Sequence, residues 1–234
     1  MNGRMIAEAM SKGSRHRPQQ SSIAGFCSYA ELRIHQRFEG LEAFGVETAN
    51  RYEVCAPDGR PVLRVREREG GFWQGVARQV AGHEWLSAFT VDVVDLQGNV
   101  VLVLEHPSEW GAHRLRVRSG SGRYLGCAYM AFSWFDKRLD VLDASDGLLL
   151  RLDAGMWSNN MRLMFAPPER ARLVPNGCAA VLQKQWGGLL TEMFTDRDSF
   201  ALHFANVLSA EERALAFATA LFADLVFYER KAGE

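Results

Sequence analysis

The residues of this sequence best placed to do chemistry are two sets of three arginines, each spaced at every second position. The first arginine ladder is Arg64, Arg66 and Arg68, and the second is Arg114, Arg116 and Arg118. Apolar residues alternate with most of them, so each ladder would lie on one face of a β-strand whose other face packs into the core. Guanidinium groups bind phosphate through paired hydrogen bonds, so either ladder could engage several phosphate groups. The alternative interpretation is a charged, solvated outer face.

Acidic neighbours distinguish the two ladders. Glu67 and Glu69 lie beside the first ladder, whereas no acidic residue occurs between His113 and Tyr124. The second ladder is therefore the better candidate for binding an anion.

Two carboxylates form the start of a possible calcium site. Asp196 and Asp198 begin like the oxygen-rich loop of an EF-hand, but its sixth position is Ala201 rather than glycine and its twelfth is Val207 rather than glutamate. The alternative is a polar turn before a strand that contains Leu202 and Phe204.

Motifs of known catalytic sites are absent from the sequence. There is no nucleophile elbow, no zinc-protease helix motif and no Walker loop, and the six histidines form no pair at i, i+4. We therefore expect a protein that is not an enzyme. The formal net charge of −1 and the pI near 6.6 argue against a nucleic-acid partner. Four widely separated cysteines suggest reduced thiols in a cytoplasmic compartment.

Short β-prone runs separated by turn residues must position the ladders. Turn chemistry recurs at 57–59, 97–99, 119–122 and 145–147. The pattern predicts one antiparallel, mainly β domain at 31–230, closed into a barrel or sandwich, after a flexible tail at 1–30. The expected strands are 52–56, 61–68, 88–94, 100–105, 114–118, 124–130, 139–142, 148–153 and 179–185.

The end of the chain predicts a helix at about 210–228. Ser209 and Glu212 form a capping-box signature, and the segment that follows is apolar on all faces. Its 15 residues at 214–228 would span about 22 Å, against about 30 Å of bilayer hydrocarbon. We expect this helix to fill the barrel, the alternative being a membrane anchor. Asp224 would then need a backbone N–H, a hydroxyl or a cation to offset its desolvation.

Several segments together resemble the phospholipid scramblase family, whose domain belongs with the tubby-like C-terminal folds. They are RIHQRFEGLEAF (33–44), GVETANRYEV (45–54), VLVLEHP (101–107), WGGLLTEMFTDRDSF (186–200) and DLVFYE (224–229). The resemblance implies a closed barrel of twelve antiparallel strands around one apolar C-terminal helix. It also implies calcium-stimulated, energy-independent movement of phospholipids between bilayer leaflets. Such an activity needs a polar path for head groups rather than a catalytic residue.

The resemblance also implies sites and partners. Asp196 and Asp198 match the start of the family's calcium segment, while Ala201 and Val207 depart from it, so we expect calcium affinity to be low or absent. The family's palmitoylated cysteine cluster has no counterpart after Pro107. The implied partner is a phospholipid membrane, met at the inner face of the plasma membrane by head-group contacts of the arginine ladders. The arginine- and serine-containing start of the chain keeps a mitochondrial address as an alternative. A second hypothesis is a non-transporting module that binds anionic lipid head groups or a protein partner.

Overall fold

The structure is a computed structural model. It describes residues 23–26, 28–36, 50–68, 88–107, 113–131, 137–154, 160–185 and 199–227. Most of the expected tail at 1–30 lies outside the described residues.

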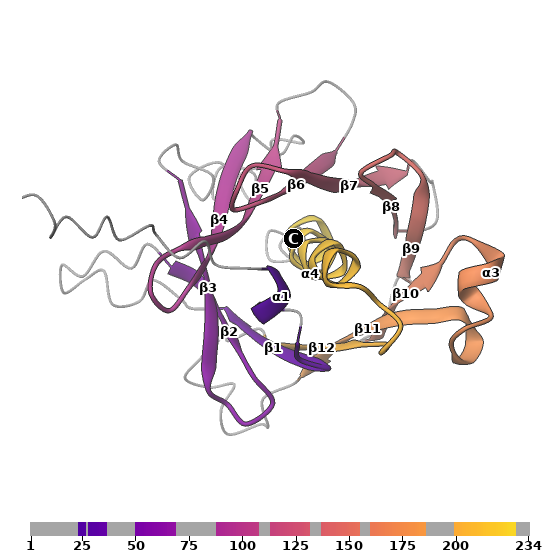
Figure 1. The fold of residues 1–234 in the computed structure, drawn as a ribbon, viewed down its shortest axis with the longest axis horizontal. Coiled ribbons are helices and arrows are strands. Elements are labelled where there is room, and N and C mark those ends of the chain that lie inside the picture. Colours follow the sequence, from indigo (N-terminus) through magenta and orange to yellow (C-terminus); the bar gives the residue numbers. More distant parts are fainter. Residues whose placement is uncertain are drawn as a thin grey trace, which may run out of the picture.

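Twelve strands form a closed antiparallel barrel, as expected (Figure 1). Each strand pairs with the next along the chain, and the last pairs with the first. Their bounds are β1 Glu31–Gln36, β2 Asn50–Cys55, β3 Pro61–Glu67, β4 Phe89–Asp95, β5 Val100–His106, β6 Arg114–Ser119, β7 Tyr124–Ala131, β8 Lys137–Asp143, β9 Leu148–Ala154, β10 Asn160–Phe165, β11 Cys178–Gln185 and β12 Ser199–Phe204.

Tight hairpins at one end of the barrel confirm the turn predictions. Gly59, Gly98 and Gly122 have positive φ angles of 83°, 85° and 86°. In the fourth hairpin Asp146 takes this conformation, with a φ of 60°. Since few residue types adopt it readily, these positions fix where each hairpin folds back and hence the register of its strands.

The barrel closes between β1 and β12, two strands far apart in the sequence. Leu32 lies opposite Leu202 and Ile34 opposite Phe200, and all four side chains are buried. Strand alternation therefore directs one face of each strand toward the interior and leaves the other outside. The strands β1, β10 and β12 were not among the nine expected ranges, and β12 matches the strand with Leu202 and Phe204 given as the alternative to the calcium loop.

Helix α4, Ala210–Phe227, runs through the ring of strands, and Figure 1 shows it at the centre of the barrel. The Ser209 backbone N–H donates to Glu212 Oε2 at 2.8 Å, and the Glu212 N–H donates to Ser209 Oγ at 3.3 Å, which is the expected capping box. Phe217 and Phe222 are fully buried. The helix is thus the filling of the barrel and not a membrane anchor. No helix in the described ranges combines the length and apolarity needed to cross a bilayer.

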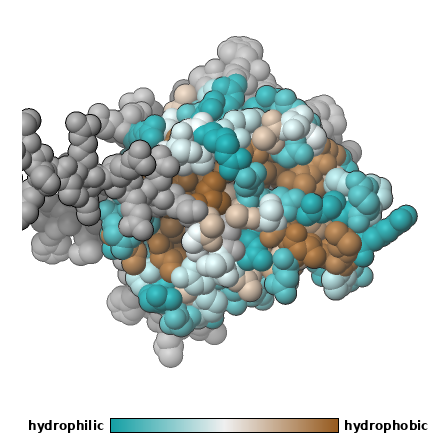
Figure 2. Space-filling model, viewed as in Figure 1, coloured by the Kyte–Doolittle hydropathy of each residue, from teal (hydrophilic) through white to brown (hydrophobic). Residues whose placement is uncertain are grey.

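Short helices lie at the end of the barrel where α4 begins. They are α1 (Ile23–Phe26), α3 (Pro168–Ala171) and the 3-10 turn η2 (Pro175–Gly177). Arg213 of α4 donates through Nη1 to the Tyr29 carbonyl at 2.8 Å, which ties the segment after α1 to the helix. On the coloured part of the face in Figure 2, apolar areas are separate from one another and have hydrophilic residues between them.

Candidate functional site

The two arginine ladders lie on one continuous outer surface of the barrel. Arg64 and Arg66 lie on β3 and Arg68 directly follows it. Strand β6 carries the second ladder, and β4 and β5 lie between the two. Arg66 lies opposite Asp92, Asp92 opposite Val103, and Val103 opposite Arg118, so one row of the sheet crosses both ladders. At about 4.8 Å per strand, the ladders are about 14 Å apart.

The first ladder is held by a carboxylate from the next strand. Arg68 Nε lies 3.0 Å from the Asp92 carboxylate, and Arg66 Nη2 lies 3.9 Å from it. Asp92 is only 3% exposed although it is charged. Because a buried carboxylate needs compensating charge, Arg66 and Arg68 have a structural role in addition to any role in binding.

The second ladder also has an acidic neighbour, which the sequence interpretation missed. Glu105 of β5 lies opposite Arg116 and accepts a hydrogen bond from Arg118 Nε at 3.2 Å. The inference that this ladder is free of acidic neighbours is therefore wrong in space, although it holds along the sequence. The Arg118 guanidinium also lies 5.8 Å from the centre of the Tyr124 ring.

Arg114 lies at the other end of the second ladder. Its Nε is buried and makes no hydrogen bond in the part of the chain that the structure describes. Burial and a hydrogen bond with Cys127 raise the pKa of Tyr124 to about 12, and the positive charge of Arg114 opposes that rise. The outer face of β6 and β7 thus carries aromatic and basic groups side by side.

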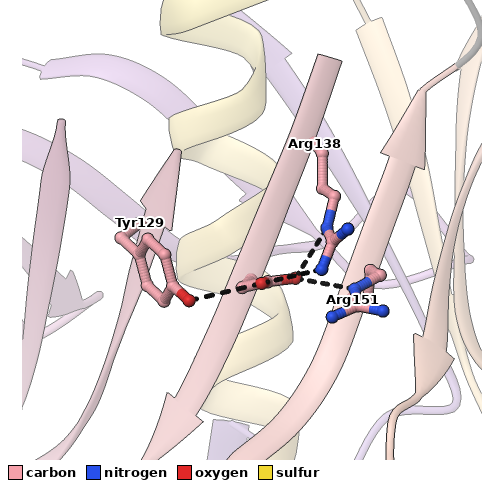
Figure 3. Close-up of polar contacts among 4 residues, drawn as sticks. Tyr129, Arg138 and Arg151 are labelled. Atoms are coloured by element: carbon pink, nitrogen blue, oxygen red, sulfur yellow. Dashed lines mark hydrogen bonds and ion pairs between the residues drawn. The ribbon is translucent and has the colours of Figure 1, made fainter. Parts of the chain in front are cut away.

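A further group of basic side chains, separate from the two ladders and not identified from the sequence, lies on β7, β8 and β9. Figure 3 shows Tyr129, Arg138 and Arg151 directed toward one carboxylate, with α4 behind the sheet. The hydrogen bonds identify this carboxylate as that of Asp140. Arg138 donates to it through Nε and Nη2, both at 3.1 Å, and Arg151 donates through Nε at 2.8 Å. The Tyr129 hydroxyl donates to it at 3.3 Å. We call these four residues the Asp140 cluster.

Electrostatics keep the Asp140 cluster ionised. Burial works to raise the pKa of Asp140, but hydrogen bonds and charge from Arg151 and Arg138 outweigh it and hold the pKa below its ordinary value. Burial and the Asp140 charge raise the pKa of Tyr129. At neutral pH the cluster therefore contains one carboxylate and two guanidinium cations.

The sequence holds only part of the signal for this cluster. The predicted turn at 145–147 places Asp140 and Arg151 on neighbouring strands, but the register shift between Val141 and Leu142 decides that they lie opposite each other.

Asp224 is a charged residue of α4 buried inside the barrel. The Tyr52 hydroxyl of β2 donates to its Oδ2 at 3.0 Å. A hydroxyl is one of the three partners that the sequence analysis required for this carboxylate.

Removing the Tyr52 hydroxyl is expected to destabilise the protein. Tyr52→Phe leaves the buried Asp224 carboxylate without one donor, which costs about 1–3 kcal/mol in the free energy of unfolding. Urea denaturation followed by circular dichroism measures this cost. Tyr129→Phe is the matched control, because the Asp140 carboxylate that loses this hydroxyl keeps three hydrogen bonds from Arg138 and Arg151. Equal losses in the two variants would contradict a special dependence of Asp224 on the Tyr52 hydroxyl.

The proposed calcium residues Asp196 and Asp198 lie outside the described residues. Ala201, the sixth position of the EF-hand comparison, lies in β12, which pairs with β1 on one side and β11 on the other. A contiguous twelve-residue loop from Asp196 to Val207 would require that strand to unpair. Among the residues that the structure describes, no group of three or more acidic, histidine or cysteine side chains is arranged to hold a metal ion.

Sequence comparisons relate the chain to known proteins. A model of the family described as Scramblase matches residues 12–230. The chain is 24% identical over 217 residues to phospholipid scramblase 1 of Homo sapiens, covering 85% of this chain and 63% of that protein. It is 25% identical over 222 residues to phospholipid scramblase 2 of Bos taurus, covering 87% and 70%. It is 22% identical over 238 residues to altered inheritance rate of mitochondria protein 25 of Saccharomyces cerevisiae, covering 84% and 70%.

A solved X-ray structure of a protein from Arabidopsis thaliana is 14% identical, with a TM-score of 0.46, and covers 90% of this chain and 96% of that one. The chain spans about 63% of the length of the human relative. The matched residues 12–230 include all twelve strands and α4. The chain therefore belongs to the Scramblase family.

Proposed function

We propose that this protein acts on phospholipid bilayers and moves phospholipids between the leaflets without an energy source. The observation that carries this proposal is the family match, which extends over the whole barrel rather than over one motif. The named mammalian relatives are phospholipid scramblases, at about a quarter identity. The activity needs head-group contact and a polar path, and it needs no catalytic side chain.

The outer surface is the part of the barrel proposed to meet the lipid. The arginine side chains lie on the outside of the barrel, so head groups can reach them while α4 stays packed in the interior. Basic surfaces are attracted to the anionic cytoplasmic leaflet, so the location we propose is peripheral, at the inner face of the plasma membrane. A mitochondrial membrane is the alternative.

A second candidate function is lipid or protein binding without transport. The burial of α4 favours it, because a helix packed inside the barrel is not available to cross the bilayer. This candidate keeps the same contacts between arginines and head groups but predicts no exchange of lipid between leaflets.

Proteoliposomes with a fluorescent lipid in both leaflets separate the two candidates. If the protein transports lipid, the labelled lipid exchanges between leaflets faster than in empty vesicles, measured by its accessibility to an external quencher. Binding without transport gives flotation with vesicles that contain phosphatidylserine and an unchanged exchange rate. If the protein neither floats with the vesicles nor accelerates lipid exchange, both candidates are contradicted.

The second ladder and the calcium residues are tested in the same assay. Arg114→Glu with Arg116→Glu should reduce flotation, whereas Arg33→Glu with Arg60→Glu changes the net charge equally outside the ladders and should not. Equal loss in both double variants would leave the second ladder as a solvated face.

If calcium accelerates exchange through Asp196 and Asp198, changing both to asparagine abolishes the acceleration and leaves the basal rate.

A further inference from the structure

We propose that Arg138 and Arg151, positioned by Asp140, form a binding site for a phosphate group on the outer face of the barrel. We take the phosphate to be that of a phospholipid head group, and this part of the inference rests on the proposed function. The site lies on β8 and β9, outside both arginine ladders.

The hydrogen bonds of the cluster fix how its arginines face. Asp140 accepts from Arg151 through Nε at 2.8 Å, and the hydrogen bonds of Arg151 within the described ranges leave its two Nη nitrogens unused. Arg138 meets the same carboxylate through Nε and Nη2. The carboxylate therefore holds the inner edges of both guanidinium groups, and the outer edge of Arg151 remains available to a ligand.

Burial and charge also fit an anion site. The Asp140 side chain is 6% exposed, while those of Arg138 and Arg151 are 34% and 33% exposed. The Asp140 carboxylate is thus buried beneath two partly exposed guanidinium groups, as Asp92 is beneath Arg66 and Arg68. The exposed edges of such groups are where a solvated anion can approach.

Neighbouring strands extend the basic surface. Arg114 of β6 lies opposite Tyr129, which lies opposite Asp140, which lies opposite Arg151, so these residues form one row across four strands. Exposed Arg162 follows on β10, and Asp153 of β9 lies opposite both Arg138 and Arg162 in the register. Four arginines thus lie on this part of the barrel, and Asp153 holds a register position between two of them.

Phosphate is the ligand whose chemistry matches these donors. Its tetrahedral oxygens accept from planar guanidinium groups on different strands, in paired hydrogen bonds. Arginines already held by a carboxylate lose little side-chain entropy on binding, which strengthens the complex relative to flexible surface arginines.

The sharpest test is Asp140→Asn. This change raises the net positive charge of the site by one, so an attraction set by charge alone would bind phosphate more tightly. Loss of the positioning carboxylate instead predicts binding weaker by about tenfold, the scale of one charge-assisted hydrogen bond. The measurement is a titration with inorganic phosphate at constant ionic strength, followed by NMR of the arginine Nε–H signals. Unchanged or tighter binding by Asp140→Asn would overturn the proposal.

Further variants keep the test decisive if Asp140→Asn does not fold. Arg151→Lys preserves the charge but removes the paired donors, so it should also weaken phosphate binding. Arg33→Gln is the matched control, because Arg33 is 39% exposed and paired with a carboxylate on another part of the barrel. It should bind phosphate as the unmodified protein does. Unchanged binding by Arg151→Lys, or equal weakening by Arg33→Gln, would reject the site.

Vesicles separate a lipid head group from free phosphate as the source. Flotation with vesicles of phosphatidylcholine and phosphatidic acid should fall for Arg151→Lys and not for Arg33→Gln. If inorganic phosphate binds through Arg151 but flotation does not depend on it, the ligand is a soluble phosphate and the lipid assignment is wrong. If the protein still accelerates lipid exchange but Arg151→Lys binds phosphate as the unmodified protein does, the phosphate site is rejected and the proposed function is not.

Discussion

Leu221→Arg is expected to abolish folding. Leu221 is 4% exposed in α4, within a helix enclosed by the strands of the barrel. An arginine there would force a long, charged side chain into the packed interior of the barrel, at a cost of several kcal/mol. Domains are stable by only about 5–15 kcal/mol, so this one change removes most or all of the net stability.

Solubility and circular dichroism after expression measure the loss. The expected result is insoluble protein, or soluble protein without a cooperative thermal transition. Leu173→Arg is the matched control, because Leu173 is 60% exposed and the chemical change is the same. A folded Leu221→Arg protein that no longer associates with membranes would show instead that α4 acts outside the barrel.

Gly126→Ala is the second change with a large expected effect. Gly126 lies in β7 with a φ of +145°, a conformation that side chains disfavour. An added Cβ would lie 2.1 Å from the Leu142 carbonyl oxygen of β8 and 3.1 Å from Leu215 Cδ2 of α4. Backbone strain and overpacking together predict a loss of about 2–6 kcal/mol in the free energy of unfolding.

Urea unfolding of Gly126→Ala and Gly25→Ala provides the comparison. A Cβ at Gly25 meets no atom within 4 Å, so that variant should retain nearly all of its stability. A loss below about 1 kcal/mol at Gly126 would mean that β7 and β8 separate easily, contrary to the close packing on α4.

Most of the strands and α4 could be predicted because each leaves a pattern in its own stretch of sequence. The alternation of Arg114, Leu115, Arg116 and Val117 identified β6, and the Ser209 capping box identified the start of α4. The strand β10, Asn160–Phe165, was not predicted, although it is as long as β2 and β6 and its buried residues alternate along the strand. The pairing of β1 with β12 depends on closure of the sheet, which no local pattern encodes.

The candidate sites were harder to predict because their contacts cross strands. Arginines at every second position are visible along one strand, so both ladders were found. The contact of Arg118 with Glu105 joins β6 to β5, and the Asp140 cluster joins three strands. These contacts depend on register, which becomes available once each hairpin is paired. Asp196 and Asp198 lie outside the described residues, so their role stays a prediction.

The order of elements along the chain has a consequence for biosynthesis. Strand β1 completes its pairing in the barrel only when β12 is available, and α4, which fills the barrel, follows β12 in the sequence. While the ribosome is still elongating the chain, eleven earlier strands emerge with their apolar faces uncovered, a state prone to aggregation. The barrel can therefore be completed only after α4 has emerged, which favours protection of the nascent chain by chaperones.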